Sequence, residues 1–145
     1  MIREGSVADI DAVMSVMRDA FDPAFGEAWT EAQTTALLVL PGAGLWVADG
    51  GFAITRTVID ECELMLIAVR RDRRGQGLGT ALLTQVIAAA RRAGAGSMFL
   101  EMRSDNPARA LYEGAGFRTV GRRRDYYRGS DGTRRDAETF RLTLA

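Results

Sequence analysis

The most constraining feature of the sequence is a glycine-rich loop at residues 74–79, RGQGLG, which lies between two apolar segments. The segment before it, 61–69, predicts a β-strand, and the segment after it, 80–94, has the apolar spacing of a helix that ends at Gly94. Glycines in such a loop leave backbone N–H groups uncovered at the positive N-terminus of the helix, an arrangement that binds phosphate groups. The loop therefore predicts a phosphate-bearing ligand.

The remaining patterning predicts a mixed sheet with helices packed on it, an α/β (α+β) fold, in a single domain over residues 1–145. Alternating apolar runs and turn residues predict strands at 1–4, 97–102, 117–124 and 137–145, and three more within 44–69 that turn at 49–51 and 60–61. Helical spacing predicts helices at 6–21, 30–40, 80–94 and 106–116. Strands 61–69 and 97–102 should be parallel, because a helix connects them. An arginine- and tyrosine-rich loop is expected at 123–136.

The residue types that are missing restrict the chemistry. The chain has no histidine, which excludes Ser–His–Asp and Cys–His triads and nearly every common zinc site, so no metal is expected. All 19 basic residues are arginines, which excludes Schiff-base lysines and the lysine of a P-loop. The single cysteine, Cys62, stands in a strand pattern and is interpreted as a core residue.

Charge and hydropathy indicate what the chain does not bind. The formal net charge is zero, so bulk attraction to nucleic acid is not expected. No apolar run approaches the length of a membrane span, and the first residues are acidic where a signal peptide would be basic. We expect a cytoplasmic monomer or homodimer, with no membrane or nucleic acid partner.

A dinucleotide-binding fold is one interpretation of the loop. It requires the spacing G-x-G-x-x-G, strand–helix–strand units and an acidic residue at the end of the next strand. Glu101 stands in that acidic position, but Gly75, Gly77 and Gly79 are spaced G-x-G-x-G, and the preceding strands form a meander. The spacing and the meander disfavour this interpretation.

The other interpretation is a resemblance to the GCN5-related N-acetyltransferase (GNAT) superfamily. Residues 74–79 match its R/Q-x-x-G-x-G/A segment, which binds the pyrophosphate of acetyl-coenzyme A, and the predicted order of elements is similar over nearly the whole chain. Three stretches, 51–69, 100–117 and 121–137, resemble the ribosomal-protein alanine N-acetyltransferase (RimI) branch. The chain departs from the pattern at Arg71, where a proline is common. It also departs in the spacing from Glu101 to Tyr112, which is one residue shorter than usual.

The resemblance implies a GNAT fold: a mixed, mostly antiparallel sheet of about six to seven strands, splayed centrally and flanked by about four helices. It implies acetyl-CoA as cosubstrate, held by Ile67, Ala68, Val69, Arg74, Gly75, Gln76, Gly77, Leu78, Gly79, Thr80 and Asn106. The neighbouring arginines 70, 71 and 73 are either contacts for the ribose phosphate or a solvated cationic face. Asn106 is either a ligand of the pantetheine arm or a helix N-cap.

Acyl transfer from a thioester requires the amine to lose a proton, and it is aided when the departing thiolate gains one. The resemblance assigns Glu101 as the base and Tyr112 as the acid. From the residues alone, Glu101 could instead be a structural carboxylate paired with Arg103 or Arg56, and Tyr112 could simply pack under its helix.

Two further groups concern the acceptor. Tyr126 and Tyr127 stand in the last predicted hairpin loop, where the resemblance implies a lip over the substrate backbone. Asp60, Glu61 and Glu63 border the predicted acceptor side and could attract an ammonium group, although a solvated turn is the favoured explanation.

The resemblance implies an enzyme that moves an acetyl group from acetyl-CoA to a primary amine. The resemblance implies the N-terminal α-amine of a protein, with the alanine of a ribosomal protein as the model acceptor. Acetylation of a small-molecule amine or of a lysine side chain, and a non-catalytic module that binds acyl-CoA, remain as alternatives.

Overall fold

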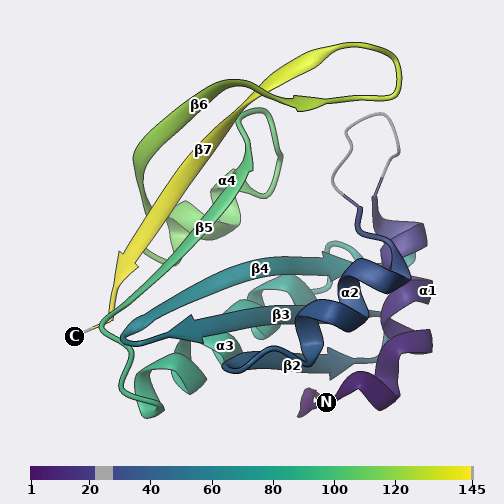
Figure 1. Ribbon diagram of the computed structural model, residues 1–145, viewed down its shortest axis with the longest axis vertical. Coiled ribbons are helices and arrows are strands. Elements are labelled where there is room, and N and C mark those ends of the chain that lie inside the picture. The colour runs from purple at the N-terminus through teal and green to yellow at the C-terminus, as the bar shows by residue number, and fades with distance from the viewer. Residues whose placement is uncertain (22–27, 145) are drawn as a thin grey trace.

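The computed structural model describes residues 1–21 and 28–144, which form a seven-stranded sheet in the order β1-β2-β3-β4-β5-β7-β6 (Figure 1). The strands are β1 (Arg3–Glu4), β2 (Ala43–Ala48), β3 (Gly51–Val58), β4 (Glu61–Val69), β5 (Ser97–Arg103), β6 (Arg118–Arg128) and β7 (Arg134–Thr143). The α-helices among these residues are α1 (Ile10–Ala20), α2 (Glu31–Leu38), α3 (Leu78–Arg92) and α4 (Arg109–Gly114). Neighbouring strands are antiparallel except β4 and β5, so the predicted mixed, mostly antiparallel sheet is confirmed.

The sheet splays between β4 and β5. The two strands pair only from Glu61↔Ser97 to Glu63↔Phe99, and after these residues they diverge. Figure 1 shows the result as two half-sheets, β1–β4 and β5–β7–β6, which separate toward the C-terminal ends of β4 and β5. A register shift in β3 and β4 leaves Met65 without a partner opposite it, and such a bulge increases the local bending of a strand.

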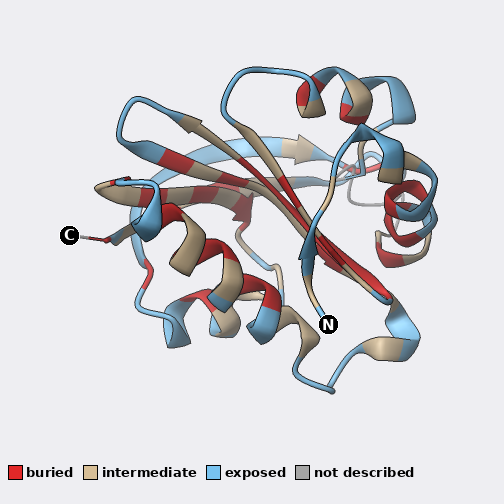
Figure 2. Cartoon of the chain, turned by 90° about the horizontal axis from the view of Figure 1, so that it is seen from below, coloured by how far each residue is buried: buried red, intermediate tan, exposed pale blue. Residues whose placement is uncertain are grey.

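Helices cover both faces of the first half-sheet, so its strands are buried on both sides (Figure 2). On β3, Phe52 and Ile54 belong to the cluster with the apolar stripe of α1, whereas Ala53 belongs to the cluster with α3. This alternation follows from the two-residue period of a strand. Cys62 is buried on the α3 side, which confirms the interpretation of it as a core residue, and burial raises the pKa of its thiol.

The two last strands differ from the sequence prediction. The sequence predicts a loop at residues 123–128 and 134–136, but β6 extends to Arg128 and β7 begins at Arg134, so only residues 129–133 form the turn. Asp125, at φ 53°, lies where the register shifts, and its N–H donates to Asp136 Oδ1 at 2.9 Å. This bulge lets the strands continue beyond it, so backbone pairing prevails over the polar composition. The last residue of the predicted strand 137–145 lies outside the described residues.

An ion cluster fixes α4 on the second half-sheet. Arg109 of α4 and Arg122 of β6 both donate to the buried carboxylate of Glu138 on β7, the latter at 2.8 Å. Burial by itself would raise the pKa of Glu138, but the hydrogen bonds from Arg109 and Arg122 outweigh it and hold this pKa below its ordinary value. The same helix carries Tyr112, whose ring packs edge-on against Phe117 at 5.8 Å.

These contacts predict that the contribution of Glu138 to stability depends on pH. Because its pKa is lower in the folded state, the carboxylate stabilises the fold above an unfolded pKa of about 4.3. That contribution is lost as the pH falls through the folded-state value. We expect Glu138→Gln to lower the free energy of unfolding by about 1–3 kcal/mol at neutral pH. The loss should shrink as the pH falls below about 4, measured by urea denaturation at several pH values.

Glu113→Gln is the matched control. Glu113 also faces Arg109, at 3.9 Å, but its side chain is largely exposed. An exposed pair of this kind contributes about 0–1 kcal/mol. A Glu138→Gln effect that is equal at every pH would contradict the assigned role of the carboxylate.

Candidate active site

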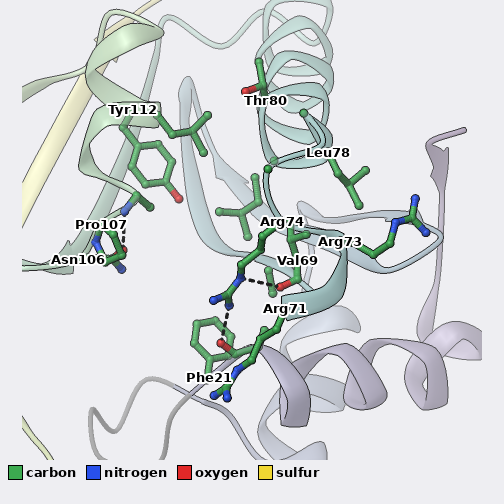
Figure 3. Close-up of a pocket in the computed structure, with 18 of the residues that line it drawn as sticks. Phe21, Val69, Arg71, Arg73, Arg74, Leu78, Thr80, Asn106, Pro107 and Tyr112 are labelled. Carbon is green, nitrogen blue, oxygen red and sulfur yellow. Dashed lines mark hydrogen bonds between the residues drawn. The ribbon is translucent and has the colours of Figure 1, made fainter.

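The splay opens a cleft of about 620 Å³ beside the glycine loop (Figure 3). It lies between the end of α1, the end of β4, the loop with the first turn of α3, and the residues that lead into α4. Every predicted cofactor residue lines it except Gln76, namely Ile67, Ala68, Val69, Arg74, Gly75, Gly77, Leu78, Gly79, Thr80 and Asn106. Gln76 instead donates from its side-chain amide to the Asp72 carbonyl at 3.3 Å.

The loop owes its shape to two glycines. Gly75 and Gly77 have φ of 76° and 84°, in the left-handed region that favours glycine, and a Cβ at either position would meet no atom within 4 Å. Gly77 is the N-cap of α3 and offers no side chain to the N–H groups of the first turn. The N-terminus of this 15-residue helix therefore presents uncapped donors beside the cleft, as an anion site requires.

The arginines around the loop divide into different roles. The Arg74 guanidinium donates to the Val69 carbonyl at 3.3 Å and to the Ala20 carbonyl at 2.8 Å, so it ties the end of β4 to the end of α1 (Figure 3). Arg70 forms a largely exposed pair with Asp72, which fits the solvated alternative. Arg71 and Arg73 line the cleft and could meet a phosphate there, although Arg73 also pairs with Asp49 at 3.0 Å.

A second cleft, of about 360 Å³, lies on the other side of the splay. It contains Glu101, Tyr126 and Tyr127 together, with an apolar wall that includes Trp29 of the segment before α2. The residues common to both clefts are Phe21, Ile67, Asn106 and Tyr112. The two clefts therefore meet at the splay, and Tyr112 stands at their junction.

Glu101 is ion-paired, but with a residue that the sequence did not indicate. Its Oε2 lies 3.2 Å from Nε of Arg123 on β6. The two expected partners are engaged elsewhere, since Arg103 pairs with Asp105 and Arg56 donates to a backbone carbonyl. The strand register explains why Glu101 meets Arg123. Glu101 lies opposite Thr139 of β7, and β6, which carries Arg123, pairs with β7 at Thr139 on the other side.

Arg123 also organises the tyrosine wall. Its guanidinium lies 4.9 Å from the ring centre of Tyr126, and the Tyr126 and Tyr127 rings meet edge-on at 5.4 Å. The two tyrosines thus line the second cleft from the last residues of a bulged strand, and not from a loop.

Tyr112 and Asn106 each combine the two roles that the sequence left open. Tyr112 is 5% exposed and packs on Phe117, yet its hydroxyl points into the first cleft (Figure 3). Asn106 Oδ1 accepts a hydrogen bond from the Ala108 N–H at 2.8 Å, which caps the turn before α4, and the same residue lines both clefts. Packing and a position in the site are therefore compatible for both residues.

The acidic residues of β4 and its preceding turn separate in the structure. Asp60 and Glu61 are exposed, and Glu61 pairs with Arg141 at 2.9 Å, in line with the favoured solvated turn. Glu63 differs, because it lines the second cleft. Burial and the negative charge of Glu101 raise the pKa of Glu63, and the positive charge of Arg56 acts in the opposite direction. The sequence pattern named Glu63 beside the acceptor but favoured a solvated turn, an explanation that fits Asp60 and Glu61 and does not fit Glu63.

Residues 1–21 and 28–144 contain no group of three or more histidine, cysteine, aspartate or glutamate residues that could hold a metal ion. None of the helices described here has the length and apolar composition needed to cross a membrane.

Comparisons with known proteins agree with this geometry. A model of the acetyltransferase (GNAT) family matches residues 12–117. The ribosomal protein bS18-alanine N-acetyltransferase of Escherichia coli strain K12 is 44% identical over 95 residues, which cover 65% of this chain and 64% of that protein, slightly less than two thirds of its length. The N-alpha-acetyltransferase RimI of Mycobacterium tuberculosis is 34% identical over 136 residues, 92% of this chain and 82% of that protein.

A solved structure extends the similarity to the whole chain. The crystal structure of the ribosomal-protein-S18-alanine N-acetyltransferase from Escherichia coli matches with a TM-score of 0.90 at 33% identity, covering 100% of this chain and 94% of that one. The family model alone spans more than half of the sequence, and the fold extends the agreement to both half-sheets. The chain therefore belongs to the acetyltransferase (GNAT) family.

Proposed function

We propose that this protein is an N-acetyltransferase that moves an acetyl group from acetyl-CoA to the N-terminal α-amine of a protein in the cytoplasm. The observation that carries the proposal is the meeting of two chemically different clefts at the splay. One has a helix N-terminus and backbone donors suited to phosphates, and the other has a carboxylate and tyrosines suited to a peptide amine.

The residues of the first cleft fit acetyl-CoA. Uncapped N–H groups at the start of α3 suit the diphosphate, and the side chains of Arg71 and Arg73 are cations for the remaining phosphate. Beyond Glu63, β4 has no ladder partner in β5, so the backbone of 67–69 offers an open strand edge to the pantetheine arm. When bound, acetyl-CoA supplies an acetyl group activated as a thioester.

The chain's own groups then handle the two protons. Glu101 takes a proton from the acceptor amine directly or through a water molecule, and Arg123 holds the carboxylate in place from the side of β6. Tyr112, at the junction of the clefts, gives a proton to the departing sulfur. A backbone N–H of 67–69 stabilises negative charge as it develops on the thioester oxygen.

The acceptor is inferred from the second cleft and from the relatives. Tyr126 and Tyr127 wall a space of about 360 Å³, which suits the end of a chain better than a passing loop. An α-amine has a pKa near 7.7–8.0 and a lysine near 10.4, a difference of about 2.5 units or ~3.5 kcal/mol, so a glutamate deprotonates the α-amine more readily. Both relatives are named for acetylation of an α-amine, and one of them for an alanine of ribosomal protein bS18. A ribosomal protein with N-terminal alanine is therefore the proposed partner.

Substitution of the loop glycine tests the cofactor site. Gly77→Glu places a bulky anion at the N-cap of α3, so the affinity for CoA measured by titration calorimetry should fall by about a hundredfold or more. Gly94→Glu is a matched control, because Gly94 has a similar φ of 86° and open space around a Cβ but lies at the far end of the same helix. Equal affinities of the two variants would rule out the loop as the phosphate site.

Substitution of the two proton-transfer residues tests the chemistry. Glu101→Gln and Tyr112→Phe should each bind CoA as the wild-type protein does, but lower kcat by about a hundredfold. Tyr112→Phe retains the ring that packs on Phe117, so the unfolding temperature should change little. Wild-type turnover in both variants would exclude the mechanism, and absence of turnover in the wild-type protein itself would favour a non-catalytic module.

Two peptides test the acceptor. One has a free N-terminal alanine and no lysine, and the other is blocked at its N-terminus and carries an internal lysine. With acetyl-CoA, thiol release should be at least about tenfold faster with the first peptide, because its amine is easier to deprotonate. Faster release with the blocked peptide would instead indicate a lysine acetyltransferase.

A further inference from the structure

Glu63 lies on the same face of the sheet as Glu101, at the point where the splay opens. It is the last β4 residue in the parallel ladder, opposite Phe99 of β5, and Glu101 follows two residues later on β5. Because side chains alternate along a strand, Phe99 and Glu101 point to the same side of the sheet. Both carboxylates line the second cleft, which confirms that they face the same space.

The two carboxylates differ in how their charge is balanced. Glu101 has Arg123 at 3.2 Å. For Glu63, no cation lies within 4.0 Å of the carboxylate and no donor within hydrogen-bonding distance, among residues 1–21 and 28–144. Its neighbour across the ladder, Arg56, directs its Nε to the Pro41 carbonyl at 3.4 Å.

An unbalanced carboxylate in a half-buried position is costly. Desolvation and the charge of Glu101 both disfavour the ionised form and raise the pKa of Glu63, and Arg56 offsets this only in part. Within the part of the chain that the structure describes, the charged groups on this face are Arg56 on β3, Glu101 on β5 and, through Glu101, Arg123 on β6. Arg141 on β7 lies over the Phe99 ring but pairs with Glu61. A cation that entered the cleft would relieve this cost, and the acceptor arrives as an ammonium ion at neutral pH for most of its population.

We propose that Glu63 binds the ammonium group of the acceptor and thereby selects for a positively charged primary amine. The inference rests on the proposed function, because it takes the second cleft as the acceptor site. Glu63 holds the amine before deprotonation, and the proton still leaves toward Glu101. This division of roles gives one carboxylate to binding and the other to proton transfer.

The test separates charge recognition from catalysis. Binding is measured by titration calorimetry with CoA present and no acetyl donor, so that no transfer takes place. The ligands are the peptide with a free N-terminal alanine and its des-amino twin, in which a propionyl group replaces the alanine. The wild-type protein should bind the amine about ten- to a hundredfold more tightly, as expected for a hydrogen bond to a charged group.

Glu63→Gln should reduce this preference to about twofold or less, and Glu63→Asp should retain part of it. Glu61→Gln is the matched control, because Glu61 stands two residues earlier on β4, outside the cleft. It should leave the preference unchanged. The CoA affinity and the unfolding temperature of Glu63→Gln should match those of the wild-type protein, which distinguishes loss of ammonium binding from a structural effect.

Failure of the inference is distinguishable from failure of the proposed function. If the wild-type protein acetylates the alanine peptide but Glu63→Gln keeps the full preference for the amine, the role of Glu63 is wrong and the function stands. If the wild-type protein acetylates the lysine peptide instead, binding is compared between that peptide and a twin in which 6-hydroxynorleucine replaces the lysine. The ratio of the two affinities then decides in the same way. A wild-type protein with no preference for either amine would also overturn the inference.

Discussion

The structure depends on the loss of backbone pairing between β4 and β5 after Glu63 and Phe99. A strand that leaves a ladder must satisfy its polar groups elsewhere. β5 is paired along its whole length with β7, and β4 with β3, but these bonds lie on the edges of the two strands that face away from the gap. One edge of β4 is therefore left open in the interior of the sheet, and the same break opens both clefts.

Packing on the two half-sheets keeps this gap open. The first half-sheet is held between α1 and α3, which bury Phe52 and Ile54 on one side and Ala53 on the other. The second half-sheet has its own support from α4, through Phe140 in the apolar core and the ion cluster at Glu138. The cluster that contains Phe140 also contains Ala53 and Leu82, so one apolar core extends under both half-sheets. Closing the gap would gain a few strand hydrogen bonds but would break this packing. Stability and the site thus arise from the same arrangement.

Charge is balanced over the whole chain but not within the site. The formal net charge is zero, yet the start of α3 and Arg71 make the first cleft electropositive, whereas Glu63 and Glu101 make the second acidic. Interactions between exposed charges fall off over about 8–10 Å in physiological salt, so local polarity outweighs net charge. The site can therefore favour an anion on one side of the splay and a cation on the other.

The sequence alone was sufficient for features that depend on neighbours along the chain. Turn chemistry and periodicity predicted the strand–loop–helix unit at 61–94, and the resemblance supplied the splayed sheet and pointed to Glu101 and Tyr112. Tertiary structure decided which side chains share a face. The pairing of Arg123 with Glu101, the position of Glu63 in the second cleft and the strand position of Tyr126 follow from register among strands far apart in sequence. A shift of one residue in that register turns every side chain to the opposite face, and no local pattern specifies it.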